Sequence, residues 1–84
     1  MAHFYVDVRV MPRAALLDPQ GQAVEHALEA LGFGGLATVR VGKALRLELE
    51  AADARAAERE ARAMCERLLA NPVTEDFTLQ VEAR

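Results

Sequence analysis

The sequence has few of the residues that mark several common classes of protein. Its 84 residues contain one cysteine, no tryptophan, one tyrosine and three prolines. The single cysteine, Cys65, cannot form an internal disulfide, so we expect a fold without covalent cross-links in a reducing compartment, the cytoplasm by default. No apolar run approaches the roughly 20 residues of a membrane span, and the alternating N-terminal segment MAHFYVDVRV excludes a signal-peptide core.

The sequence also lacks an excess of positive charge. Its 13 acidic and 10 basic residues give a net charge of −3, which argues against binding to nucleic acid or to an anionic membrane. A chain of this length is expected to form one domain, residues 1–84. At this size folding hides only about 60–65% of the surface that the unfolded chain exposes, so the small core favours self-association, as a dimer or a tetramer.

Hydrophobic periodicity predicts the element order βαββαβ. Alternation indicates strands and recurrence at three and four residues indicates helices: strands at 4–10, 38–41, 45–49 and 77–81, and helices at about 19–31 and 53–70. Gly32 is expected to end the first helix in the left-handed conformation, and Gly42 with Lys43 to close a hairpin through a type II′ turn. The order predicts an α+β two-layer plait, ferredoxin-like or a close variant, with a four-stranded sheet and both helices on one face.

The chemistries common on such a fold do not find their residues in this sequence. A copper or zinc carrier needs paired soft ligands, whereas Cys65 has no partner and lies on an apolar helix stripe. An RNA-recognition domain needs stacking aromatic residues on its middle strands, and these are missing. Arg13 lacks the glycine-rich anion loop of a small phosphatase. His3 and His26 belong to no set of nucleophile, base and orienting group, so we expect no catalytic, metal or cofactor site in this chain.

Three junctions are more tightly specified than the fold requires. They are LDPQG before the first helix, VRVGK through the predicted hairpin and LLANPVTEDF after the second helix. Each has a structural explanation, because Asp18 can cap a helix, Gly42 can permit a turn and Asn71 can precede a helix stop. Neither a cap nor a hairpin needs the side chains of Gln20 and Lys43. These two are therefore the strongest candidates for contact with a partner.

These stretches, in this order and spacing and together with AVEHALEALGF, resemble the PurS family, the small subunit of phosphoribosylformylglycinamidine synthase. The likeness extends from the first predicted strand to the last. It implies a non-catalytic subunit in de novo purine biosynthesis. Such a subunit would bridge a glutaminase subunit and a large synthetase subunit, and would support the transfer of ammonia between them. The resemblance implies that ATP and magnesium bind to the large partner subunit.

The resemblance also supplies a set of candidate interface residues. They are Arg13, Asp18, Pro19, Gln20, Gly21, Arg40, Gly42, Lys43, Asn71 and Pro72. Thr74 and Phe77 depart from the family pattern, which usually has an aliphatic residue at the first position and often tyrosine at the second. Two alternatives stay open: a dimeric regulatory module of ferredoxin-like fold that binds a small molecule, and a plain homo-oligomeric structural protein. Binding of an amino acid or a nucleotide by the chain alone would favour the regulatory module.

Overall fold

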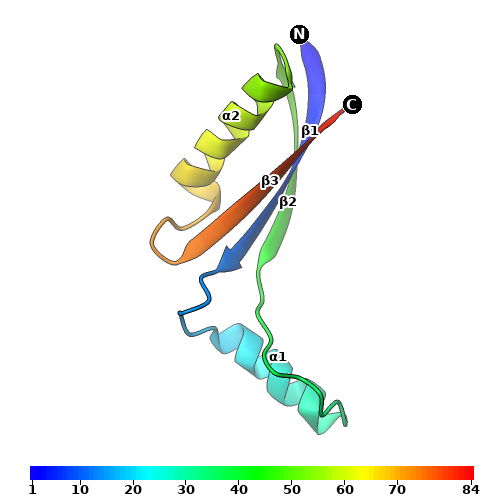
Figure 1. Ribbon diagram of the computed structural model, residues 1–84, viewed down its shortest axis with the longest axis vertical. Coiled ribbons are helices and arrows are strands. Elements are labelled where there is room, and N and C mark those ends of the chain that lie inside the picture. The colour runs from blue at the N-terminus through cyan, green and yellow to red at the C-terminus, as the bar shows by residue number, and fades with distance from the viewer.

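The computed structural model describes residues 1–84 as a long, thin molecule of 51 × 26 × 14 Å. A sheet with one helix beside it forms the upper part of Figure 1, and a second helix projects below the end of the sheet. The elements are β1 (Ala2–Pro12), α1 (Pro19–Ala30), β2 (Lys43–Ala51), α2 (Ala54–Met64), a π-helical turn η1 (Cys65–Leu69) and β3 (Glu75–Ala83). The predicted α+β class is therefore confirmed.

The sheet has three antiparallel strands in the order β2-β1-β3. β1 lies in the middle, with Val6 opposite Leu47 on one side and opposite Val81 on the other. Because side chains alternate between the two faces of a strand, this register brings the apolar residues of all three strands to one face. We call it the inner face, and α2 packs on it. The opposite, outer face carries charged and polar side chains.

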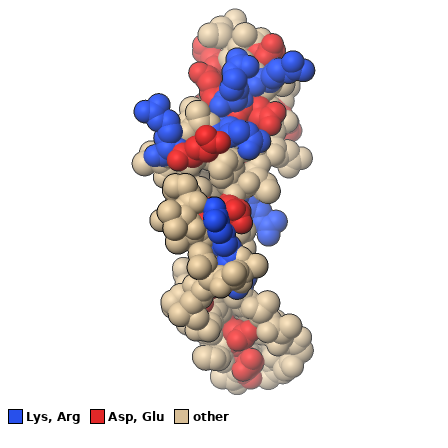
Figure 2. All heavy atoms as spheres, turned by 60° about the vertical axis from the view of Figure 1, so that its left-hand side comes forward, with Lys and Arg blue, Asp and Glu red and all other residues tan.

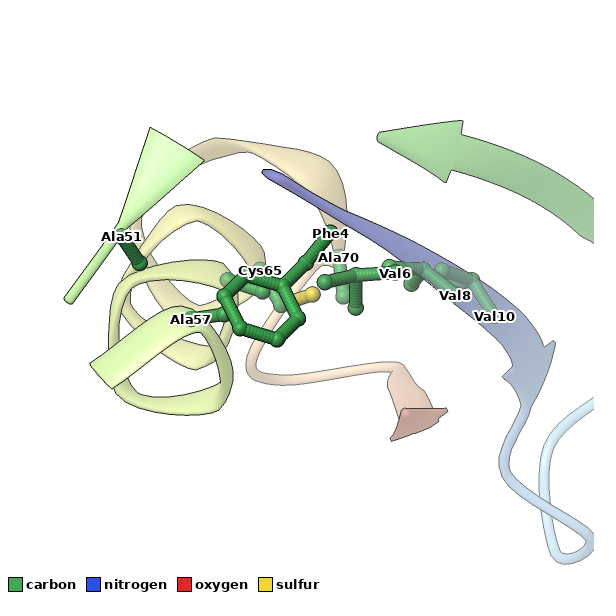
Figure 3. Close-up of a cluster of buried hydrophobic side chains, with 9 residues drawn as sticks. Phe4, Val6, Val8, Val10, Ala51, Ala57, Cys65 and Ala70 are labelled. Atoms are coloured by element: carbon green, nitrogen blue, oxygen red, sulfur yellow. The ribbon is translucent and has the colours of Figure 1, made fainter. Parts of the chain in front are cut away.

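The core lies between the inner face and α2 (Figure 3). Its least exposed side chains come from β1 and from one stripe of α2 and η1: Val6, Val8, Val10, Ala57, Ala61 and Cys65. The two alanines allow the helix to approach the strands closely, and the valines suit the pleated surface of a strand. Burial raises the pKa of the Cys65 thiol. This cysteine therefore serves as a small apolar core residue.

Both predicted helices are present with boundaries close to those expected. The carboxylate of Asp53 caps α2 by accepting a hydrogen bond from the Ala56 N–H at 2.8 Å. The predicted helix 53–70 continues through α2 into η1, so its last turn has the wider π form. Gly32, at φ 100°, follows α1 in the expected left-handed conformation. Neither helix has the length and apolar character needed to cross a bilayer.

The predicted strand 38–41 and its hairpin are wrong. Gly42 does not have the positive φ that a type II′ turn needs at that position, and Lys43 is already the first residue of β2. Residues 37–42 instead continue the line of β2 beyond the end of the sheet, beside α1 (Figure 1). No strand of this chain lies there to pair with them. The sheet therefore has three strands where the alternation predicts four.

The prediction of both helices on one face of the sheet is also wrong, because only α2 covers the inner face. α1 lies beyond the sheet, and Gly21 is its only buried residue (Figure 1). Without a second helix, the inner-face leucines of β2 stay half-buried: Leu45, Leu47 and Leu49. The sheet is thus covered by one helix where two were expected, and α1 has no sheet of its own chain to pack against.

Candidate subunit interface

Two short segments connect the sheet to α1 and run side by side. Residues 13–18 lead out from β1, and residues 40–42 lead back into β2 (Figure 1). We call these two segments the neck, and residues 19–39 beyond them the arm. No backbone-to-backbone hydrogen bond joins the outgoing segment to the returning one. Side chains make that connection.

Asp18 is the first of these connections. One carboxylate oxygen, Oδ1, accepts a hydrogen bond from the Gly21 N–H at 3.0 Å and so caps α1. The other, Oδ2, accepts from the Val41 N–H at 2.8 Å in the returning segment. These bonds, with that from Val41 foremost, lower the pKa of the Asp18 carboxyl below its usual range. Asp18 therefore starts the helix and ties the neck together.

Arg40 ties the neck in the opposite direction. Its guanidinium donates from Nη1 to the Leu16 carbonyl at 2.6 Å and from Nη2 to the Ala14 carbonyl. Both carbonyls belong to the outgoing segment. The rigid fork of a guanidinium suits this task, because it presents separate donors to two acceptors at once.

Two glycines allow close approach of the backbone in and beside the neck. A Cβ atom on Gly21 would fall on the carbonyl oxygen of Val39, and one on Gly42 would meet the Val10 carbonyl oxygen and the Met11 sulfur. Neither glycine has a positive φ. Glycine is therefore required here for space, and not for the turn geometry that the sequence suggests at Gly42.

Arg13 anchors the root of the neck to the loop between η1 and β3. Its backbone N–H donates to the Thr74 carbonyl at 2.9 Å, and its Nη2 donates to the Pro72 carbonyl at 2.7 Å. Its Nε also lies 3.4 Å from the Asp76 carboxylate. The side chain of Asn71 shapes the same loop by accepting a hydrogen bond from a backbone N–H two residues on.

The three junctions singled out in the sequence thus meet at one end of the sheet. Most of the candidate interface residues build the neck or its root: Arg13, Asp18, Gly21, Arg40, Gly42, Asn71 and Pro72. Pro19 opens α1, as expected for a residue without an N–H to satisfy. Gln20 and Lys43 are exposed, and their side chains form no hydrogen bond within the chain. These two remain free to contact a partner.

The arm exposes large apolar side chains that the sequence pattern assigns to no surface. Leu31 and Phe33, which follow α1, are 73% and 59% exposed. Charged groups gather on the upper part of the molecule and are sparse on the lower part (Figure 2). The glycines on both sides of Phe33 were the available signal, because an aromatic side chain in a glycine-rich loop has little of its own chain to pack against. An exposed apolar patch of this kind marks contact with another protein.

The outer face of the sheet is polar, and several of its charged groups pair with one another. Arg46 donates to Asp7 at 2.8 and 3.1 Å and lowers the pKa of that carboxyl. Arg46 and Arg84 lie 5.3 and 5.9 Å from the centre of the Tyr5 ring, and Arg84 also pairs with Glu48. A hollow of about 750 Å³ is lined by residues of all three strands. Asp7 and Arg46 of this lining are engaged with each other, whereas Arg9 forms no ion pair within the chain.

Comparison with known proteins relates most of the chain to one family. Residues 5–83 match the family model PurS, described as phosphoribosylformylglycinamidine (FGAM) synthase. The chain is 40% identical over 84 residues to the PurS subunit of phosphoribosylformylglycinamidine synthase from Synechocystis, covering 99% of this chain and 84% of that protein. It is 42% identical over 79 residues to the subunit of the same name from Bacillus subtilis, covering 94% and 93%.

Solved structures agree with this relationship. PurS from Bacillus subtilis superposes with a TM-score of 0.84 at 42% identity, covering 94% of this chain and 98% of that one. A chain in the structure of PurLQS from Thermotoga maritima superposes with a TM-score of 0.89 at 30% identity, covering 98% of this chain and 100% of that one. The projecting arm belongs to the part that is covered. The chain is a member of the PurS family of phosphoribosylformylglycinamidine synthase subunits.

Proposed function

We propose that this chain is the small, non-catalytic subunit of FGAM synthase in de novo purine biosynthesis and acts in the cytoplasm. Its membership of the PurS family over almost its full length carries this proposal. The match to a chain of the PurLQS structure supports a role in which it holds a glutaminase subunit and a synthetase subunit together. ATP and magnesium then belong to the large subunit.

The role of such a subunit follows from the chemistry of ammonia. Ammonia released from glutamine would be protonated or lost in bulk water before it reached the synthetase site. A docked path that excludes water prevents both losses. This chain contributes contact surface to that path, and the exposed side chains of Gln20 and Lys43 are our candidates for the contact.

Self-association belongs to the same proposal, and the occupant of the arm's apolar surface is a second copy of this chain. Each chain has a helix without a sheet and a sheet with half-buried leucines where a second helix would lie. Exchange of arms between two chains satisfies both at once. Such an exchange is two-fold symmetric, so it closes after two chains.

The last residues of the arm, which precede the returning segment of the neck, support the same arrangement. Residues 37–39 lie outside any strand, and their backbone groups belong to no β-ladder. The edge strands β2 and β3 each have one unpaired side. Unpaired strand edges readily accept a further strand, so residues 37–39 of one chain can supply the second chain with the fourth strand that its own sheet lacks.

Light scattering tests the exchange. The wild-type chain is expected at no less than twice its 9.2 kDa mass at micromolar concentration, and Phe33→Asp at the monomer mass, because a buried carboxylate would oppose docking. Leu68→Asp is the matched control, since Leu68 is 82% exposed and lies outside the arm. An unchanged mass for Phe33→Asp would exclude the exchange.

A reconstituted three-subunit complex tests the bridging role. Lys43→Glu and Gln20→Ala are expected to leave the circular dichroism spectrum unchanged. A docked charged contact broken at one end costs about 2–5 kcal/mol, which weakens association roughly 30-fold or more. Glutamine-dependent synthesis should therefore fall much further than synthesis fed with ammonium salt.

Two exposed positions provide the controls for this assay. Arg59→Glu makes the same type of charge reversal on α2, and Gln22→Ala makes the same truncation two residues from Gln20. Neither control is expected to separate the two activities. Equal glutamine-dependent rates for Lys43→Glu and wild type at limiting subunit concentration would remove Lys43 from the interface.

A further inference from the structure

We infer that Arg40 is a positioning residue that fixes the direction of the arm and thereby makes two chains close on each other instead of adding in an open series. The inference rests on the arm exchange proposed above. It concerns a different question, which is what holds the arm in the direction that such an exchange requires.

The neck needs such a residue because it has no ladder of its own. Its two segments are short, and no backbone hydrogen bond joins them. Two chain segments without a ladder can twist about each other by small changes in φ and ψ, and at the far tip of the arm such changes become large displacements. The arm projects beyond the end of the sheet, in a molecule whose long dimension is 51 Å (Figure 1).

Arg40 removes this freedom by holding two points of the outgoing segment from one point of the returning segment. Its two donors reach carbonyls two residues apart, those of Ala14 and Leu16. A single bond between the segments, such as that from Val41 to Asp18, still permits rotation about the bond. Three bonds at separate points do not. Arg40 therefore contributes the two additional bonds that fix the direction.

Further contacts hold the neck where it joins the sheet. Arg13 ties the start of the outgoing segment to the Pro72 carbonyl and to Asp76. On the returning segment, Gly42 lies against the Val10 carbonyl with no space for a Cβ atom. All of these contacts lie within one chain. They are therefore present before two chains meet and are retained after the arms are exchanged.

The direction of the arm matters because a two-fold pair needs both arms to be correct at once. If the correctly directed fraction of each arm is f, the apparent dissociation constant rises by 1/f². A fall of f to about one third therefore weakens the pair about tenfold. Arms that point elsewhere can still dock on a further chain, and head-to-tail contacts that do not close produce an open series.

The experiment measures the direction and the assembly separately. Spin labels on Gly34→Cys at the arm tip and Ala52→Cys after β2 lie at exposed positions, while the buried Cys65 stays unlabelled. The doubly labelled chain is mixed with an excess of unlabelled chain, so that pulsed electron spin resonance reports one intrachain distance. Arg40→Met is compared with Arg59→Met, a matched change at an exposed arginine on α2.

We expect one narrow distance distribution for wild type and for Arg59→Met, and a clearly broader one for Arg40→Met. In light scattering, Arg40→Met should dissociate at about tenfold higher concentration and show species larger than the main assembly. Arg40→Lys should give a distribution of intermediate width, because the lysine amine keeps the positive charge but lacks the two-pronged donor geometry of the guanidinium. An equally narrow distribution in Arg40→Met would overturn the inference. Failure of the arm exchange is a separate result, which Phe33→Asp reports through its mass in light scattering.

Discussion

At the scale of single residues, the main feature of this chain is that its candidate interface residues mostly serve the neck. Asp18 and Arg40 each connect the two neck segments, and both do so by bonds from a side chain to the backbone. Such bonds need one particular residue type at one position but place few demands on the neighbouring residues. This explains how a single position such as Asp18 can be tightly specified in an exposed part of the molecule.

The pH dependence of the arm should follow the titration of Asp18. Its pKa is lowered in the folded chain, so its contribution to stability is complete at pH values above the unfolded value of 3.8 and is lost as pH falls through the lower folded value. We expect the Val41 amide resonance to shift over that acid range. In Asp18→Asn this shift should be absent and the neutral-pH melting temperature lower. A melting temperature that falls with acid in parallel for both proteins would contradict this role.

Gly42 offers a prediction that depends on space alone. Gly42→Ala places a methyl group against the Val10 carbonyl and the Met11 sulfur, so we expect the free energy of unfolding to fall by about 1–3 kcal/mol. Gly34→Ala is the matched control, because nothing lies within 4 Å of its Cβ position. It should be neutral or stabilising by about 0.4–1 kcal/mol, through the unfolded chain. Urea denaturation of both variants measures the difference, and equal midpoints would refute the steric explanation.

At the scale of elements, the sequence predicts most of what depends on neighbours along the chain. The cap at Asp18 and the stop at Gly32 are local events, and both are found as expected. The alternation in 38–41 correctly indicates an extended segment. It cannot report whether a strand lies beside that segment, because pairing depends on chain packing far away in the sequence. The hairpin and the position of α1 were mispredicted for this one reason.

The candidate site shows the same limit. The sequence identifies Asp18, Arg40 and Asn71 as parts of three separate junctions, and nothing in their spacing shows that the junctions meet. For the exposure of Phe33 the flanking glycines were only an indirect signal, since an apolar residue after a helix normally packs on its own sheet. Knowledge of the tertiary fold is needed for both.

The stability of α1 should depend on protein concentration, whereas that of β1 should not. α1 has 12 residues with one buried among them, and a helix of this length is marginal in water without tertiary packing. We expect the amides of α1 to exchange with deuterium faster on dilution, while those of β1 keep their protection. Hydrogen-exchange mass spectrometry at nanomolar and micromolar concentration measures this. Concentration-independent exchange in α1 would show that the arm is stable alone.

At the scale of the whole molecule, the chain divides into two parts with different surfaces. The sheet and α2 form a core under a charged exterior, whereas the arm carries few charges (Figure 2) and exposes Leu31 and Phe33. The charged residues of the arm itself are few and acidic: Glu25 and Glu29. Solubility therefore depends on the sheet and α2, and association depends on the arm.

The nearly complete exposure of α1 has a genetic consequence. If the helix of each chain completes the sheet of its partner, a chain with a damaged arm but an intact sheet still accepts the arm of a normal chain. It then leaves that normal chain incomplete. In a cell that makes equal amounts of both, random pairing leaves about a quarter of the pairs intact. Lesions in residues 19–39 would therefore be dominant, whereas lesions that unfold the sheet would remove the chain from pairing and be recessive.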